Sequence, residues 1–222
     1  SFIGYLVIGI FLIINGLVLW IFPSQFNILD SGYANMDSLF ILAPWIFLFL
    51  VPAVTMRLFS DEKKSGTIEF ILTKPLSDLQ IIFAKYLAGI SIVILALLPT
   101  LIYFLSVYIL GNPQGNIDSG GTWGSYIGLM FLSAVYVAIG LFSSSISENQ
   151  IISFLVGMVI SILAFIGFET LSSMNFMFAF KNFLIEIGIN EHYRSMSRGV
   201  IDSRDIIYFL SAISVFILAT KI

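Results

Sequence analysis

The chain has 222 residues, of which 59% are hydrophobic and only 10% are charged, and its net charge at pH 7 is −3. A soluble domain carries about 25% charged residues, and so much apolar side chain facing water would drive aggregation. The composition therefore excludes a soluble globular protein and a disordered chain, and the mild negative charge gives no reason to expect a nucleic-acid partner. Cysteine is absent and His192 is the only histidine, which excludes disulfides and a histidine-built metal site.

Six apolar runs follow one another along the chain, and most have the roughly 20 residues that a helix needs to cross a bilayer. The runs are continuous and do not alternate between apolar and polar residues, which indicates helices. The sequence therefore predicts an all-α polytopic membrane protein, with a single transmembrane domain over residues 1–222 and six transmembrane helices. The predicted spans are residues 2–22, 39–59, 81–110, 123–142, 151–168 and 205–222.

Polar residues and prolines punctuate these runs. Asn15 in the first run indicates either a polar conduit or a hydrogen bond between helices. Pro44 and Pro52 predict kinks in the second run, and Pro99 interrupts the third, because proline removes a helical hydrogen bond. The chain opens with Ser1 inside an apolar run, so we expect a further segment to precede it.

Lysine and arginine accumulate in short cytoplasmic loops, and their distribution predicts the orientation of the chain. The residues around the connection between the second and third runs carry Arg57, Lys63, Lys64, Lys74 and Lys85. The connections after the first and third runs carry neither lysine nor arginine. The connection between the second and third runs is therefore predicted to be cytoplasmic. With six spans, both termini are then also in the cytoplasm. Residues 169–204 become an extracytoplasmic segment despite their four cations, because longer translocated segments follow the rule weakly. Residues 174–189, which are apolar but interrupted by charges, are expected to lie on the outer interface.

Residues 61–77, reading DEKKSGTIEFILTKPLS, predict a short amphipathic helix at the cytoplasmic membrane surface. Gly66 and Thr67 can start this helix, with Thr67 as its N-cap residue. Pro75 stops it, which gives a predicted range of residues 67–74.

The apolar side of this helix carries Ile68, Ile71 and Leu72 at the spacing i, i+3, i+4. Such a helix can anchor the connection at the membrane surface or dock a cytoplasmic partner, and the residues alone leave both interpretations open. Glu62 precedes the helix and can hold the connection to it or to the partner through a charge-assisted hydrogen bond.

Small residues recur every four positions in two of the runs: Ser153, Gly157 and Ser161 in the fifth, and Gly124 and Gly128 in the fourth. Small side chains let helix backbones approach closely in a membrane. Contacts within one chain and contacts between two copies explain such a pattern equally well. We predict that Ser153, Gly157 and Ser161 form a surface between two copies.

The sequence holds few groups that could carry out chemistry. It lacks the G-x-x-x-x-G-K-[ST] pattern that cradles ATP phosphates, and it lacks zinc-protease and nucleophile-elbow motifs. Glu169 is an acidic residue that adjoins the end of a run, whereas ion-driven transporters bury ionisable groups near the bilayer midplane. The chain is therefore poorly equipped as an enzyme or as an ion-coupled carrier.

Residues 55–89, reading TMRLFSDEKKSGTIEFILTKPLSDLQIIFAKYLAG, resemble the signature of the permease subunits of type 2 ABC exporters. In that family an acidic residue, a basic pair and Gly-Thr precede an amphipathic coupling helix, and a small residue followed by lysine opens the third span, as at positions 84–85. SENQ at 147–150 and SRGVIDSRDIIYFLS at 197–211 are similar to a narrower branch, the gliding-motility-associated (GldF-like) permeases.

The resemblance implies a six-span permease subunit in the bacterial inner membrane that works with a cytoplasmic ABC ATPase subunit, which binds the ATP, so that the permease needs no cofactor. It also implies a second permease copy, identical or different, contact with membrane lipids, and, for the gliding branch, a membrane subunit with a large extracytoplasmic domain. It assigns ATPase coupling to the segment that contains Glu62, Gly66, Thr67, Ile68, Ile71 and Leu72.

The expected function is to couple ATP hydrolysis by the separate subunit to transport or mechanical work, in association with gliding motility. The alternative is a structural or force-transmitting membrane component of a motility or secretion machine that moves no substrate.

Overall fold

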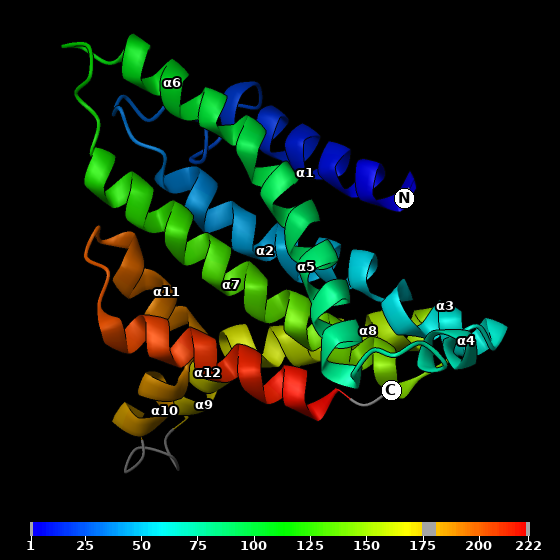
Figure 1. The fold of residues 1–222 in the computed structure, drawn as a ribbon. Coiled ribbons are helices and arrows are strands. Elements are labelled where there is room, and N and C mark those ends of the chain that lie inside the picture. Colours follow the sequence, from blue (N-terminus) through cyan, green and yellow to red (C-terminus); the bar gives the residue numbers. More distant parts are fainter. Residues whose placement is uncertain (1, 175–180, 221–222) are drawn as a thin grey trace.

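The computed structural model describes residues 2–174 and 181–220, with the side chain of Leu72 left out. Every regular element within these residues is a helix, as the sequence predicts, and the long helices run roughly along a common axis (Figure 1). The α-helices are α1 (Phe2–Trp20), α2 (Asp37–Thr55), α3 (Arg57–Ser65), α4 (Ile68–Leu72), α5 (Asp78–Leu97), α6 (Leu101–Leu110), α7 (Ser119–Ile146), α8 (Gln150–Ile162), α9 (Phe168–Ser172), α10 (Lys181–Ile187), α11 (Ile189–Ser197) and α12 (Ser203–Ala219). A 3₁₀ turn, η1 (Leu98–Thr100), joins α5 to α6, and a π-helical turn, η2 (Leu163–Gly167), joins α8 to α9.

Five helical stretches are long and apolar enough to cross a membrane, and they coincide with the first five predicted runs. They are Phe2–Trp20, Asp37–Ser65, Asp78–Leu110, Ser119–Ile146 and Gln150–Ser172. The sixth predicted run overlaps α12, which begins two residues earlier, at Ser203, and has 17 residues. Because a helix rises 1.5 Å per residue, α12 is about 25 Å long, less than the roughly 30 Å of a bilayer core. The sixth span therefore stays a prediction.

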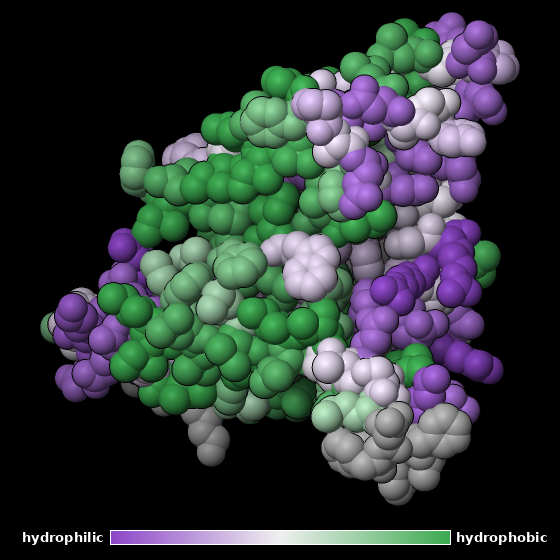
Figure 2. All heavy atoms as spheres, turned by 180° about the vertical axis from the view of Figure 1, so that it is seen from behind, coloured by the Kyte–Doolittle hydropathy of each residue, from purple (hydrophilic) through white to green (hydrophobic). Residues whose placement is uncertain are grey.

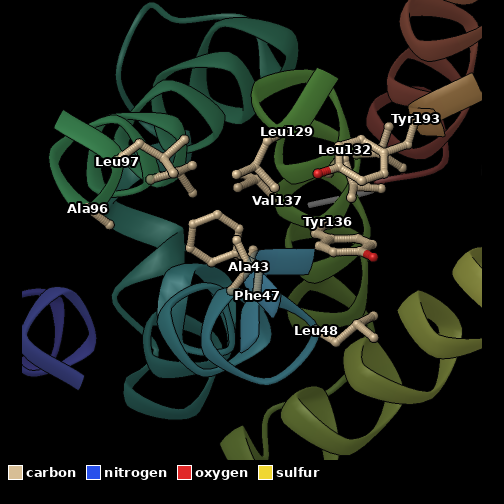
Figure 3. Close-up of a cluster of buried hydrophobic side chains, with 14 of the residues drawn as sticks. Ala43, Phe47, Leu48, Ala96, Leu97, Leu129, Leu132, Tyr136, Val137 and Tyr193 are labelled. Atoms are coloured by element: carbon tan, nitrogen blue, oxygen red, sulfur yellow. The ribbon is translucent and has the colours of Figure 1, made fainter. Parts of the chain in front are cut away.

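α7 lies at the centre of the bundle and packs against α2, α5, α8, α11 and α12. Figure 3 shows side chains from α2, α5 and α11 converging on it. Leu129, Leu132, Tyr136 and Val137 of α7 are completely buried in this cluster. Most of the stabilising contact between the spans is therefore made through one helix.

Two glycines set how closely the neighbouring helices approach α7. A Cβ atom at Gly140 of α7 would overlap the side chain of Thr55 on α2, whose own Cβ would lie 2.8 Å away. A Cβ atom at Gly89 of α5 would lie 2.7 Å from Cγ1 of Val137. Small residues thus bring backbones together at two crossings that sequence analysis did not single out.

The prolines act differently in the two runs that they interrupt. Pro44 and Pro52 both lie inside α2, and the helical path breaks only at Met56, one residue after its end. The predicted second span, residues 39–59, therefore extends into a separate helix, α3. Pro99 forms part of η1 and divides the third run into α5 and α6, as expected of a residue that cannot donate a helical hydrogen bond.

Exposed apolar side chains form a broad band between two polar ends of the molecule (Figure 2). One polar end contains α3 and α4, and the other contains the connections between the spans at the opposite end of the bundle. A surface of this kind is stable where hydrocarbon replaces water around the band.

α11 lies against the beginning of α7, outside the predicted spans. A Cβ atom at Gly124 would be 2.5 Å from the carbonyl oxygen of Met196, and one at Gly128 would be 3.2 Å from Met196 Cβ. The close packing predicted for Gly124 and Gly128 is therefore confirmed, with α11 as the partner. Tyr193 of α11 donates a 2.7 Å hydrogen bond to the carbonyl of Phe40 on α2, and burial raises the pKa of its hydroxyl above the ordinary value.

His192 links α11 to α12 and to the end of α10. Its Nδ1 lies 2.7 Å from Oδ1 of Asp205, and its Nε2 lies 2.8 Å from the carbonyl oxygen of Glu186. The imidazole stacks on the ring of Tyr208 at 3.8 Å between centroids. The Asp205 side chain is 6% exposed, and its Oδ2 atom is buried without a hydrogen-bond partner.

The prediction of an interfacial segment over residues 174–189 falls partly on residues 175–180, which lie outside the described part of the chain.

Candidate coupling surface

α3 is joined to the centre of the bundle by the hydroxyl of Ser144 on α7. This oxygen accepts hydrogen bonds from the backbone N–H groups of Phe59 and Ser60 at 2.9 and 3.1 Å. It donates a third hydrogen bond of 3.0 Å to the carbonyl of Met56. The first N–H groups of a helix have no partner within it, so a side chain from α7 satisfies them and fixes the break between α2 and α3.

A partly buried ion pair joins α3 to α5. Lys85 Nζ donates hydrogen bonds of 2.5 Å to Oε1 of Glu62 and to the carbonyl of Leu58, and it lies 4.8 Å from the ring centroid of Phe59. The two charged side chains are 16% and 25% exposed. Glu62 therefore makes a charge-assisted hydrogen bond, but to Lys85 of α5, whereas the sequence pointed to the amphipathic helix or to a partner protein.

Two further contacts reach the junction of α7 and α8. Lys63 Nζ donates a 2.5 Å hydrogen bond to the carbonyl of Ser145, in the last turn of α7, where the helix dipole favours a cation. Gln150 Nε2, in the first turn of α8, donates a hydrogen bond to Oδ1 of Asp61. α3 is thus bound to α5, α7 and α8 at once. Sequence analysis missed Asp61, Ser144 and Gln150, because partners more than 80 residues apart leave no local pattern.

The start of the predicted amphipathic helix is corrected by the backbone. Gly66 adopts φ 69°, the left-handed conformation that glycine favours at helix C-termini, and it ends α3 rather than starting α4. Thr67 precedes α4 but makes no capping hydrogen bond; its hydroxyl lies 2.8 Å from that of Ser65. An N-cap side chain reaches the helix from an extended backbone, whereas Thr67 has helical dihedral angles.

α4 is shorter than the predicted helix over residues 67–74, because it spans only Ile68–Leu72. Ile68 and Ile71 share one side, as their spacing predicts, but both are partly buried against the hydrophobic core of their own chain. Phe70 is 73% exposed and Glu69 is also exposed, so these two residues face solvent at this end of the molecule. Among the described apolar side chains of α4, Phe70 is therefore the one that is available to a partner. The side chain of Leu72 lies outside the described part of the chain.

A comparison with known protein families identifies the family of this chain. The family model described as ABC-2 family transporter protein matches residues 24–219. The chain belongs to the ABC-2 transporter family. No curated protein matches the sequence. The ABC-2 permease is the non-catalytic membrane component of a transporter, and permeases of this family work with separate ABC ATPase subunits.

The small-residue stripe of the ABC-2 permease is directed into its own chain. Ser153 and Ser161 are 1% and 0% exposed, and a Cβ atom at Gly157 would be 3.6 Å from the Cα of Gly140 on α7. A substituent at Gly157 would also lie 2.7 Å from the hydroxyl of Ser143. The predicted contact between two copies is corrected to a contact between α7 and α8, because close approach within the chain already uses the small side chains.

Asn15 of the permease is buried inside the bundle. Its Nδ2 donates a 2.8 Å hydrogen bond to the carbonyl of Phe11 in the same helix, and its Oδ1 is buried without a partner. Neither the conduit nor the interhelical hydrogen bond that the sequence suggests is present at this residue. Among the residues that the structure describes, no group of three or more His, Asp or Glu side chains gathers to hold a metal ion.

Proposed function

We propose that α3 and α4 form the surface through which a cytoplasmic ABC ATPase moves this ABC-2 permease. The observation that carries the proposal is that α3 is bound to three other helices, α5, α7 and α8, while Phe70 is exposed just beyond it. A displacement of this surface is passed to three candidate spans without an intervening flexible segment. A rigid lever of this kind is what a subunit without its own ATP site requires.

Replacement of Phe70 by aspartate is expected to release the ATPase from the permease. An exposed aromatic side chain that anchors an interface contributes at least about 2 kcal/mol, which is roughly thirty-fold in affinity. The measurement is the amount of ATPase that co-purifies with the permease, normalised to permease abundance in the membrane. Tyr33→Asp is the matched control, because Tyr33 is 76% exposed and lies in the connection between α1 and α2. Normal stoichiometry and ATP turnover with the Phe70 variant would refute the coupling role of α4.

The proposal includes an orientation with α3, α4 and both termini in the cytoplasm and with six spans in the inner membrane. The cations around α3 and α4 support it. Of the four cations in residues 169–204, which oppose it, Arg194 lies 3.3 Å from the carboxylate of Glu169. Single cysteines at Ser119 and Thr73, both exposed, can be labelled without background because the chain has no cysteine. An impermeant thiol reagent applied to intact cells should label position 119 and spare position 73; the reverse pattern means an inverted topology.

We also propose that the permease pairs with a second permease chain through the outward side of α8. Ile151, Leu155 and Val159 are 68%, 47% and 50% exposed there, opposite the stripe that faces α7. A disulfide between two copies of a Leu155→Cys variant is the test, and failure to crosslink in membranes at normal abundance would exclude this surface.

The proposed association with gliding motility rests on the resemblance of residues 147–150 and 197–211 to gliding-motility-associated permeases. The proposal of a further membrane subunit with a large extracytoplasmic domain rests on the same resemblance. Gliding of cells that lack this permease tests the association, and unchanged gliding would remove it. The alternative of a force-transmitting component that moves no substrate predicts that ATP turnover of the purified complex responds to a protein partner and to no solute.

A further inference from the structure

A groove of about 500 Å³ opens between α5 and α12, with α7 as its floor. α5 touches α7 closely at Gly89 and then diverges from α12, which leaves the floor uncovered (Figure 1). The groove is lined by apolar side chains from all three helices, among them Leu87 and Ile90 of α5, Met130 and Ala134 of α7, and Leu210 of α12.

The two tyrosine hydroxyls along this groove are already used. Tyr86 Oη donates a 3.3 Å hydrogen bond to the carbonyl of Ala134, and Tyr126 Oη shares a 3.0 Å hydrogen bond with the hydroxyl of Thr100. A buried water molecule needs roughly two to four polar partners, and this lining leaves it only the indole N–H of Trp123, at one end of the groove. The natural occupant is therefore hydrocarbon.

The groove matches the hydrocarbon of one bilayer leaflet in length. Its floor runs from Trp123 to Ala134, and these two residues, 11 positions apart on one helix, are separated by about 16 Å along its axis, close to half of a bilayer core of roughly 30 Å. It is continuous with the apolar band that faces lipid, because Leu87 and Leu210 on its two walls are 56% and 51% exposed.

We infer that one acyl chain of a bilayer phospholipid occupies this groove, with its ester group at Trp123 and its methyl end toward Tyr86. Trp123 is 49% exposed near the start of α7, and an indole N–H at the membrane interface can donate a hydrogen bond to an ester carbonyl. The inference goes beyond the coupling role, because the lining belongs to α5, α7 and α12 and includes no residue of α3 or α4.

A lipid with brominated acyl chains tests the inference, because bromine quenches tryptophan fluorescence only on close approach. The full chain with Trp20→Phe and Trp45→Phe retains Trp123 as its single tryptophan. It is reconstituted with brominated phosphatidylcholine and then purified in mild detergent until bulk lipid is gone. We expect one phospholipid per chain to remain and the fluorescence of Trp123 to stay quenched. Unquenched fluorescence after this step would overturn the inference.

Substitution separates the groove from ordinary lipid contact. Ala134→Phe fills the floor and is expected to abolish both the retained phospholipid and the quenching of Trp123. Leu95→Phe is the matched control, because Leu95 of α5 is 53% exposed but does not line the groove, and it should keep both signals. Equal retention in the two variants would also overturn the inference. If Ala134→Phe does not accumulate as a folded chain, the quenching measurement on the unfilled groove decides alone. Both readouts are independent of ATPase binding, so the lipid inference and the coupling proposal can be refuted separately.

Discussion

Replacement of His192 by phenylalanine is expected to destabilise the permease by about 3 kcal/mol, because it leaves a buried carboxylate unpaired. Phenylalanine can keep the stacking on Tyr208 but donates no hydrogen bond. Oδ1 of Asp205 then loses its partner, and Oδ2 already has none. We place the effect at the lower end of the range for a broken buried pair, since Asp205 lies in the first turn of α12, where the helix dipole favours a negative charge.

The measurement is thermal unfolding of the purified full chain in detergent, and the midpoint should fall by several degrees. The double variant His192→Phe/Asp205→Asn distinguishes loss of pairing from loss of packing. It should recover much of the lost stability, because the amide carries no charge to be left unpaired. A single variant with an unchanged midpoint, or a double variant that is less stable still, would contradict this account.

Replacement of Gly140 by alanine is expected to force α2 and α7 apart. The new methyl group would overlap the Thr55 side chain, and rotating the Thr55 hydroxyl cannot relieve the clash, because Thr55 Cβ is itself only 2.8 Å from the added atom. The helices must shift or the side chains must leave their preferred rotamers, which costs roughly 1–3 kcal/mol in a packed core. The effect should reach α3, because Thr55 lies two residues before it.

Gly9→Ala is the matched control for this substitution. Gly9 also lies inside a helix, but an added Cβ would meet nothing within 4 Å. Alanine is the better helix former, so this control should be neutral or slightly stabilising. Thermal unfolding and the yield of monodisperse protein report both variants. Equal behaviour of the two would show that the contact at Thr55 is not a tight one.

The sequence contains enough information to predict the spans but not which side of each helix meets which neighbour. Hydropathy predicted all five candidate spans, because the need to match a bilayer is a property of each run alone. The spacing of Ile68 and Ile71 correctly placed them on one side of a helix. It could not say whether that side meets a partner or the chain's own core, because both surfaces are apolar.

The prediction of a contact between two copies through Ser153, Gly157 and Ser161 was wrong for the same reason. Small residues allow close packing within a chain and between chains alike. The hydrogen bonds and the ion pair that hold α3 could not be predicted, for a different reason. Lys85 and Glu62 each look like ordinary cytoplasmic charges, and their pairing depends on how α3 and α5 are brought together. The hydroxyl of Ser144 is one of several serines near the end of α7, and only the fold selects it.

The central place of α7 has a consequence for biosynthesis. In the apolar part of this candidate span 78% of the residues are buried, against at most 50% in the other four candidate spans. The span of α7 also has the lowest mean hydropathy of the five. It leaves the ribosome after α2 and α5, which can receive two of its sides, but before α8, which covers Gly140 and Ser143. α7 and α8 are joined by only a few residues, so the second helix follows almost at once. We therefore expect α7 and α8 to enter the bilayer as a helical hairpin, because only together do they cover the small-residue surface between them.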